Sequence, residues 1–329
     1  MAKYKVLRLG QITPESSIEK EILSKIDAEV IVNTSTDESS IIDDVRDVDA
    51  IIVRGLVPIT DKILEAATKC KIVAQGSVGF NHIDIAAAGK RNIYVSNSPA
   101  AEWCVDEVSD ITMMLILGIE RMAPWFHQKV KEGHWREKLN EVKPIFALRG
   151  QTLGLFALGA IARAVAEKAK PFGFKIIATD PFVSADEAKK MGIEMVDFDT
   201  LLKTSDVISI HAPLMDATFH VFNREAIGKM KNTAFLVNAA RGPLIDQKAL
   251  YEALKAKQIA GAGFDVLEDE PPKPGEPILT LDNIFVVPHI GAYSETSVLK
   301  PSRICANEVV RVLGGEPPKA WVNRKEMQK

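Results

Sequence analysis

The chain has 329 residues, of which 47% are hydrophobic and 26% are charged, as in ordinary globular proteins. At roughly 100–200 residues per domain, this length predicts about two domains, each able to bury a core. The formal net charge of −3 leaves no basic footprint, so nucleic acid is not expected as a partner.

The first hundred residues alternate short β-branched runs with segments of helical spacing. The runs lie at residues 4–9, 29–33, 50–54, 71–74 and 92–95, and the helical segments include residues 17–26 and 61–68. This alternation predicts a parallel sheet covered by helices. A long amphipathic segment follows at residues 103–130, with no internal proline before Pro124, and it predicts one linking helix. A polar stretch at residues 132–150 then separates two regions.

The alternation restarts at Gln151 and predicts a second, more complete unit. Its expected strands lie at residues 152–157, 175–179, 207–211, 234–238, 260–265 and 284–288, and its helices include residues 160–171, 185–191 and 247–257. The last segment, from about residue 297, predicts one helix and a proline-containing tail. The fold class is therefore α/β with two doubly wound parallel-sheet domains. Ligands of such folds bind beyond the carboxyl ends of the strands and often between domains.

Apolar runs and cysteines indicate the compartment. The longest near-apolar stretch, residues 111–119, is shorter than the roughly 20 residues of a bilayer span, so no membrane partner is expected. The first ten residues lack the apolar region of a signal peptide. Cys70, Cys104 and Cys305 are widely spaced, which predicts a cytoplasmic protein without a disulfide framework or a metal site.

A phosphate-binding turn is expected where the strand at 152–157 leads into the helix at 160–171. The sequence from Ala157 to Ala162 is ALGAIA, so only the middle glycine of a GxGxxG fingerprint, Gly159, is present. Ala162 is an accepted variant, whereas Ala157 departs from the pattern and costs about 1 kcal/mol or more if the turn needs a positive φ. A plain strand–turn–helix has the same appearance.

Asp180 strengthens the dinucleotide interpretation. It ends the next strand, 18 residues after Ala162 (180 − 162), where an acidic residue accepts hydrogen bonds from the adenosine ribose. A carboxylate there also repels the additional phosphate of NADP, so NAD is the expected cofactor. The alternative is an ordinary aspartate that begins a turn before Pro181.

Three polar side chains follow apolar strands of the second region. They are Arg241, Glu270 and His289. A guanidinium matches a substrate carboxylate, with about 1.5–3 kcal/mol for each charged hydrogen bond. An imidazole can donate a proton to a carbonyl oxygen, and a nearby carboxylate orients its ring. These residues suit the reduction of a 2-oxoacid, although each alone can be a solvated turn, an acidic surface run or a loop histidine.

The motifs around these residues resemble three signatures of the D-isomer-specific 2-hydroxyacid dehydrogenases. They are VNAARGPLID at residues 237–246, GAGFDV at 261–266 continuing to Glu270–Pro271, and PHIGA at 288–292. The resemblance covers nearly the whole chain. The family includes glyoxylate and hydroxypyruvate reductases, 3-phosphoglycerate dehydrogenases and the C-terminal-binding-protein corepressors.

The resemblance implies a Rossmann NAD-binding domain at residues 101–297 and a flavodoxin-like substrate-side lid domain at 1–100, completed by 298–329. It implies that Arg241 holds the substrate carboxylate, that His289 is the acid/base and that Glu270 is its partner. It also implies a homodimer formed through the NAD domain.

The resemblance further implies a set of binding residues. Asp265 and Val105 would lie at the nicotinamide, and Asp180 and His211 at the adenosine ribose. The remaining cofactor residues would be Gly159, Ala160, Ile161, Ala239, Ala240 and Gly291. The substrate carboxylate would meet the loop of Ser77, Val78 and Gly79, and Arg54 would meet a distal phosphate, unless it is an ordinary surface arginine.

The chain also departs from the family pattern. Ala160 stands where many members have a polar residue, and with Ala157 and Ala162 this predicts weaker cofactor affinity than usual. Gln75 occupies an often basic position. Residues 293–295 resemble the corepressor branch, but its pocket tryptophan is replaced by Ala292.

Two hypotheses follow from these observations. The leading one is an NAD-dependent dehydrogenase acting on a hydroxypyruvate/glyoxylate-type or 3-phosphoglycerate-type substrate. The alternative is an NAD-sensing scaffold, like the corepressors, with vestigial catalysis.

Overall fold

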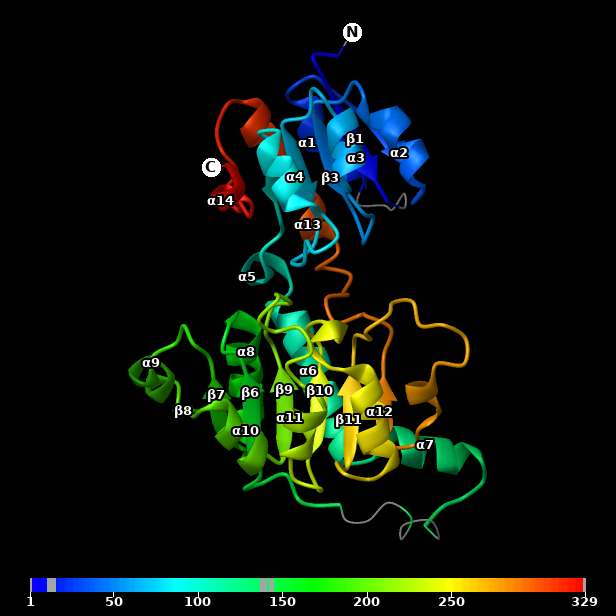
Figure 1. The fold of residues 1–329 in the computed structure, drawn as a ribbon, viewed down its shortest axis with the longest axis vertical. Coiled ribbons are helices and arrows are strands. Elements are labelled where there is room, and N and C mark those ends of the chain that lie inside the picture. Colours follow the sequence, from blue (N-terminus) through cyan, green and yellow to red (C-terminus); the bar gives the residue numbers. More distant parts are fainter. Residues whose placement is uncertain (1, 11–15, 137–140, 142–144, 328–329) are drawn as a thin grey trace. The chain divides into compact units, whose positions relative to one another are not determined.

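The computed structural model describes residues 2–10, 16–136, 141 and 145–327, and it divides into two compact units (Figure 1). Unit 1 comprises Met1–Cys104 and Tyr293–Lys329, and unit 2 comprises Val105–Ala292. The sequence placed these boundaries at 100/101 and 297/298. Residues 137–140 and 142–144 of the expected polar stretch, and the last two residues of the tail, lie outside the described residues.

Unit 1 contains a five-stranded parallel sheet in the order β2-β1-β3-β4-β5, which is the flavodoxin-like order. Its strands are β1 (Tyr4–Leu9), β2 (Ala28–Asn33), β3 (Ala50–Val53), β4 (Ile72–Gln75) and β5 (Tyr94–Ser96). Its helices are α1 (Ser16–Ser24), α2 (Glu38–Val45), α3 (Asp61–Ala66), α4 (Ile85–Lys90), α5 (Ala100–Trp103), α13 (Leu299–Leu313) and α14 (Arg324–Met327).

Both faces of the unit 1 sheet are covered. Helices α2, α3 and α4 pack one apolar cluster, and α1 and α13 pack the other. Helix α13, although it lies near the end of the chain, therefore completes the N-terminal unit. A buried ion pair ties these ends together, since Arg8 Nε donates to Glu19 Oε2 at 2.6 Å and Ser302 of α13 donates to Glu19 Oε1 at 2.8 Å.

The expected single linking helix at residues 103–130 is wrong. The segment forms α5, α6 (Val105–Glu120) and α7 (Ala123–Lys131). The first break is at Cys104, whose φ of −133° is not helical. The second is at Met122, whose left-handed φ of 52° separates α6 from α7, and Pro124 lies in the first turn of α7. The amphipathic pattern did not reveal these breaks, because it reports the spacing of apolar side chains and not the backbone angles.

Unit 2 contains a seven-stranded sheet in the order β12-β11-β10-β9-β6-β7-β8, and all of its neighbouring strands are parallel. In chain order this is the Rossmann arrangement with a seventh strand added. The strands are β6 (Thr152–Phe156), β7 (Lys175–Thr179), β8 (Glu194–Met195), β9 (Val207–Ile210), β10 (Phe235–Asn238), β11 (Gly261–Phe264) and β12 (Ile284–Val286). The predicted α/β class with two parallel sheets is confirmed, whereas β8 was not predicted.

Helices α6 and α8 (Ala160–Ala169) pack on one face of this sheet. Helices α10 (Phe198–Thr204), α11 (Arg224–Gly228) and α12 (Gln247–Lys255) pack on the other, and α9 (Ala185–Lys190) lies beside β8. Among the described residues, no helix is long and apolar enough to cross a membrane.

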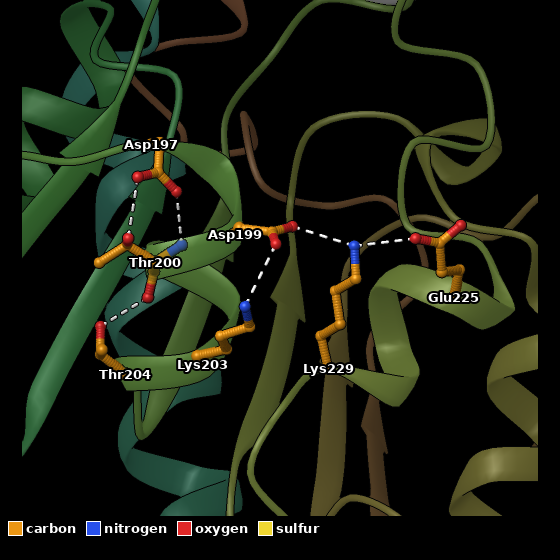
Figure 2. Close-up of polar contacts among 7 residues, drawn as sticks. All are labelled: Asp197, Asp199, Thr200, Lys203, Thr204, Glu225 and Lys229. Atoms are coloured by element: carbon orange, nitrogen blue, oxygen red, sulfur yellow. Dashed lines mark hydrogen bonds and ion pairs between the residues drawn. The ribbon is translucent and has the colours of Figure 1, made fainter.

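Short polar contacts fix the ends of α10 and α11, as Figure 2 shows. Asp197 begins α10 by accepting from the Thr200 N–H at 2.7 Å. Lys229, at the end of α11, is 3.0 Å from Asp199 and 2.8 Å from Glu225. These contacts lie on the surface of α10 and α11, away from the loops that carry Arg241 and Glu270.

Candidate active site

The carboxyl ends of β10, β11 and β12 place three polar side chains at one edge of the unit 2 sheet. Arg241 follows β10 by three residues, His289 follows β12 by three, and Glu270 lies in the loop after β11. Because these strands are adjacent and parallel, their carboxyl ends lie at a common edge. The sequence alone could not show that residues so far apart in the chain meet.

Glu270 and His289 form a direct pair. Glu270 Oε2 lies 2.6 Å from His289 Nδ1, and Glu270 Oε1 accepts the N–H of Leu267 at 2.9 Å. Burial by itself would raise the pKa of Glu270, but the bond and charge of His289, the Leu267 N–H and the nearby charge of Arg241 outweigh it. The pKa of Glu270 therefore lies below its ordinary value. An ionised Glu270 binds Nδ1 and so fixes the orientation of the His289 ring. The other ring nitrogen, Nε2, makes no contact with Glu270.

Asp265 holds the turn that carries His289. Its carboxylate accepts the N–H groups of Ile290 and Gly291 at 2.7 and 2.8 Å, and its carbonyl accepts the His289 N–H at 2.8 Å. His289 has a left-handed φ of 53°, which a non-glycine residue keeps only when its surroundings enforce it. A Cβ at Gly291 would crowd Asp265, so the close approach requires glycine. Burial raises the pKa of Asp265.

Asn238 presents Arg241, and sequence reasoning missed it. The Asn238 side chain is fully buried, donates to the Arg241 carbonyl at 2.8 Å and accepts the Ala240 N–H at 2.9 Å. A Cβ at Gly242 would overlap the carbonyl oxygen of Leu267, so the two loops are in direct contact. An asparagine that ends a buried strand was the available signal, since its amide can satisfy the turn after the strand.

The turn between β6 and α8 has the geometry of an anion site. Gly159 precedes α8 without a side-chain cap, and a Cβ there would meet no atom within 4 Å. The first N–H groups of α8, at Ala160 and Ile161, are among those that an α-helix leaves without an intrahelical partner, and such groups suit an anion. Ala157 has a φ of 73°, so the turn does require the left-handed conformation that its sequence made costly.

Asp180 closes this turn. Its Oδ2 accepts the Leu158 N–H at 2.8 Å, and its Oδ1 accepts the Phe182 N–H at 2.7 Å. The Asp180 carboxylate therefore lies beside the turn between β6 and α8.

The other expected cofactor residues lie on the same unit. Val105 begins α6, and Ala239 and Ala240 follow β10. His211 follows β9, with Nε2 2.9 Å from Ser209 Oγ, and burial lowers its pKa to about 3, so the ring is neutral.

The expected substrate residues lie in unit 1, after β4. Gln75 donates to Ser77 Oγ at 2.6 Å, and Ser77 Oγ donates to the Gly79 carbonyl at 2.9 Å. Asn97, which sequence reasoning missed, donates to the Val78 carbonyl at 2.7 Å. These bonds give the Gly76–Gly79 loop a defined shape.

The Arg54 guanidinium is bound within unit 1. Its Nη1 donates to the Gly76 carbonyl at 3.3 Å, and its Nη2 donates to the Val298 carbonyl at 3.4 Å. Arg54 therefore connects the loop after β4 to the segment that leads into α13. Among the described residues, no group of three or more histidine, cysteine, aspartate or glutamate side chains is placed to hold a metal ion.

Comparisons with known proteins agree with this arrangement. Residues 113–291 match the family model described as D-isomer specific 2-hydroxyacid dehydrogenase, NAD binding domain. A D-3-phosphoglycerate dehydrogenase of Methanocaldococcus jannaschii is 39% identical over 92% of this chain, which spans only 57% of that protein. A glyoxylate reductase of Korarchaeum cryptofilum is 37% identical over 92% of both chains.

A solved structure of a glyoxylate reductase from Paecilomyes thermophila has a TM-score of 0.88 to this chain, with 27% identity. The match covers 99% of this chain and 100% of that one.

Proposed function

The chain belongs to the D-isomer specific 2-hydroxyacid dehydrogenase family, and from this premise we propose that it interconverts a small 2-oxoacid and the corresponding D-2-hydroxyacid with NAD(H). The observation that carries the proposal is the Glu270–His289 pair, 2.6 Å apart, at the same sheet edge as Arg241. The three side chains supply an acid/base, its orienting carboxylate and a carboxylate-binding cation.

The residues of unit 2 fit NAD. The uncapped start of α8 offers N–H groups to a pyrophosphate, and at Gly159 no side chain stands in its way. Asp180 beside this turn suits the adenosine ribose and disfavours the additional phosphate of NADP. We assign Val105, Gly159, Ala160, Ile161, Asp180, His211, Ala239, Ala240, Asp265 and Gly291 to cofactor binding.

When bound, NADH supplies the hydride that the carbonyl carbon of the oxoacid accepts. His289 donates a proton from Nε2 to the carbonyl oxygen, and Glu270 stabilises the protonated ring through Nδ1. Arg241 binds the substrate carboxylate with its planar guanidinium. In the reverse direction, His289 accepts the hydroxyl proton.

The substrate class follows from Arg54 and from the relatives. We propose a small substrate of the glyoxylate or hydroxypyruvate type, with its carboxylate at Ser77, Val78 and Gly79. The Arg54 guanidinium already donates to Gly76 and Val298, so its role is to hold that loop. A 3-phosphoglycerate-type substrate is the competing class, because D-3-phosphoglycerate dehydrogenases are among the relatives.

We further propose a cytoplasmic homodimer formed through unit 2. The exposed apolar side chains of that unit include Val130, Trp135 and Phe146, and we propose that the interface covers them. The relatives are named as dehydrogenases and reductases, and the proposed catalytic residues are all present, so the scaffold alternative has no support. Light scattering on the purified chain tests the dimer, and a monomer at micromolar concentration contradicts it.

An oxoacid panel tests the activity. Glyoxylate, hydroxypyruvate, pyruvate, a branched oxoacid and 3-phosphohydroxypyruvate are supplied in turn with NADH or NADPH, and the loss of reduced-cofactor absorbance is followed. We expect turnover with NADH and the highest kcat/KM for glyoxylate or hydroxypyruvate. NADH binding without turnover of any oxoacid would overturn the activity, and a preference for the phosphorylated substrate would overturn the substrate class.

A further inference from the structure

A second histidine–carboxylate pair lies at the carboxyl edge of the unit 2 sheet. His220 Nε2 is 2.7 Å from Glu268 Oε1, and each side chain is 30% exposed. His220 belongs to the loop between β9 and α11, and Glu268 belongs to the loop after β11. Glu268 precedes Glu270 by two residues, so the His220–Glu268 pair is close in the chain to the Glu270–His289 pair. The proposed mechanism assigns no role to His220 or Glu268.

Glu268 is held on both carboxylate oxygens and through its backbone. Oε2 accepts the Gln247 N–H at 3.1 Å, while the Glu268 N–H donates to Gln247 Oε1 at 3.0 Å. Gln247 begins α12 and also donates to Glu276 at 3.0 Å. The segment before Glu270 is therefore bound to the start of a packed helix.

His220 connects this segment to the one that carries Arg241. The His220 N–H donates to the Pro243 carbonyl at 2.9 Å, two residues after Arg241. Gly242 itself lies against Leu267, whose N–H donates to Glu270. His220 has a left-handed φ of 49°, so its backbone conformation depends on the contacts around it. His220 thus bonds both loops that present catalytic groups, the Glu268 loop through its side chain and the Arg241 loop through its backbone N–H.

We infer that His220 and Glu268 are positioning residues. The bond between them fixes the position of the Glu270–His289 pair relative to Arg241. The inference rests on the proposed function. Glu270 Oε1 is bound to the Leu267 N–H, so a movement of the 267–268 segment moves the carboxylate that orients the His289 ring. A displacement of about 1 Å in a catalytic arrangement can cost up to about a hundredfold in rate.

A purely structural role for the pair predicts a loss of stability alone, and Lys229 provides the matched control. The Lys229 side chain is 32% exposed and makes two ion pairs, with Asp199 and Glu225, on the outer helices shown in Figure 2. Lys229→Ala therefore removes comparable polar contacts from a comparably exposed position that bonds neither catalytic loop.

The experiment compares His220→Ala, Glu268→Gln, the double variant and Lys229→Ala with the wild-type chain. We expect kcat to fall by about tenfold or more in the first three, with KM for NADH unchanged within twofold and a melting temperature no lower than that of Lys229→Ala. The pH dependence of kcat should change as well. The limb at which the acid–base pair loses its proton should move to lower pH, since a displaced Glu270 stabilises the protonated His289 ring less.

Two further features keep the test decisive. Asp265 and Arg241, whose charges also act on the acid–base pair, are unchanged in every variant. The double variant should be no worse than the poorer single variant, because the two residues act as one unit. Glu268→Gln keeps the size of the side chain and an oxygen for the Gln247 N–H, so it decides the test if His220→Ala does not fold.

Wild-type kcat and an unshifted pH profile in folded variants would overturn the inference, as would fully additive losses. The pH titration of the His289 ring followed by NMR is a readout that needs no turnover. If the wild-type chain turns over no oxoacid, the proposed function fails. The positioning role is then still tested by NMR: a His289 titration curve that differs between the variants and the wild-type chain would support it, and an unchanged curve would refute it.

Discussion

Two carboxyl groups at opposite ends of the unit 2 sheet are held in opposite ways. Glu270 lies at the carboxyl end, 2.6 Å from His289, and these contacts lower its pKa despite burial. Glu120 ends α6 near the amino end of β6, is only 3% exposed and accepts from Gln151 at 3.0 Å. Burial raises the pKa of Glu120 to about 7.

The difference lies in the partners. Glu270 has a histidine ring, an arginine charge and a backbone N–H near it, whereas Glu120 Oε1 has no hydrogen-bond partner among the described residues. Burial favours the neutral form of both groups, and only an opposite charge with hydrogen bonds reverses that preference. Of these two carboxyl groups, only the one beside the proposed acid–base histidine has a pKa below its ordinary value.

Breaking the Glu270–His289 pair should produce the largest effect. We expect His289→Ala to lower kcat by about 10²–10⁴-fold, because the proton donor is lost, while NADH binding persists. Steady-state kinetics and a fluorescence titration with NADH measure the two quantities. A kcat within tenfold of the wild-type value would show that another group donates the proton.

Glu120→Gln tests the other member of the comparison. The pKa of Glu120 is about 7 in the folded chain and near its ordinary 4.5 in the unfolded chain, so the folded state binds more protons between these values. The wild-type chain should therefore lose stability as pH rises from about 4.5 through 7. At pH 8 we expect the glutamine variant to be more stable by about 3 kcal/mol, with little of that gain at pH 4.

Urea unfolding at several pH values measures this difference. Glu225→Gln is a suitable control, since the Glu225 side chain is 79% exposed. A pH-independent difference between Glu120→Gln and the wild-type chain would mean that Glu120 is ionised when folded.

Arg241→Lys separates charge from shape at the carboxyl end. Lysine keeps the positive charge but loses the planar fork, so we expect KM for the oxoacid to rise by about 10-fold or more while kcat changes less. Initial rates over a range of oxoacid concentration distinguish the two parameters. If neither parameter changed, Arg241 would not bind the substrate carboxylate.

Ala157→Gly should have the smallest effect, because the turn proposed to bind phosphate acts through its backbone. Glycine relieves the left-handed φ of 73°, and we expect a gain in stability of up to about 1 kcal/mol and tighter NADH binding. Calorimetric titration with NADH measures the affinity, which we expect to be weaker than micromolar in the wild-type chain. Sub-micromolar wild-type affinity would contradict the interpretation of this altered turn.

Much of the fold was predictable because parallel strands buried on both faces are apolar runs. The runs at residues 152–157 and 234–238 each correspond to a strand, β6 and β10. The division of the expected linking helix into α5, α6 and α7 was not predictable, since its breaks at Cys104 and Met122 depend on single backbone angles. Strand β8 has only two residues, too short for a periodic signal.

The same contrast applies to the site. Arg241, Glu270, His289 and Asp180 could be named from motifs, because each follows a strand in a pattern whose chemistry requires that residue type. Asn238 could not, since an asparagine reveals its role only when both ends of its amide have partners. The Asp265 carboxylate likewise accepts from the turn after His289, which no spacing in the sequence indicates.

By itself the sequence determined the class of fold, the family and the residues able to carry the chemistry, because hydrophobic period and residue type are local properties. Only the tertiary structure decided which of those groups meet, since Glu270 Oε2 and His289 Nδ1 are brought to 2.6 Å by the pairing of β11 with β12. It also decided protonation, because the pKa values of Glu270 and Glu120 differ through the burial and charges around them and not through their residue type.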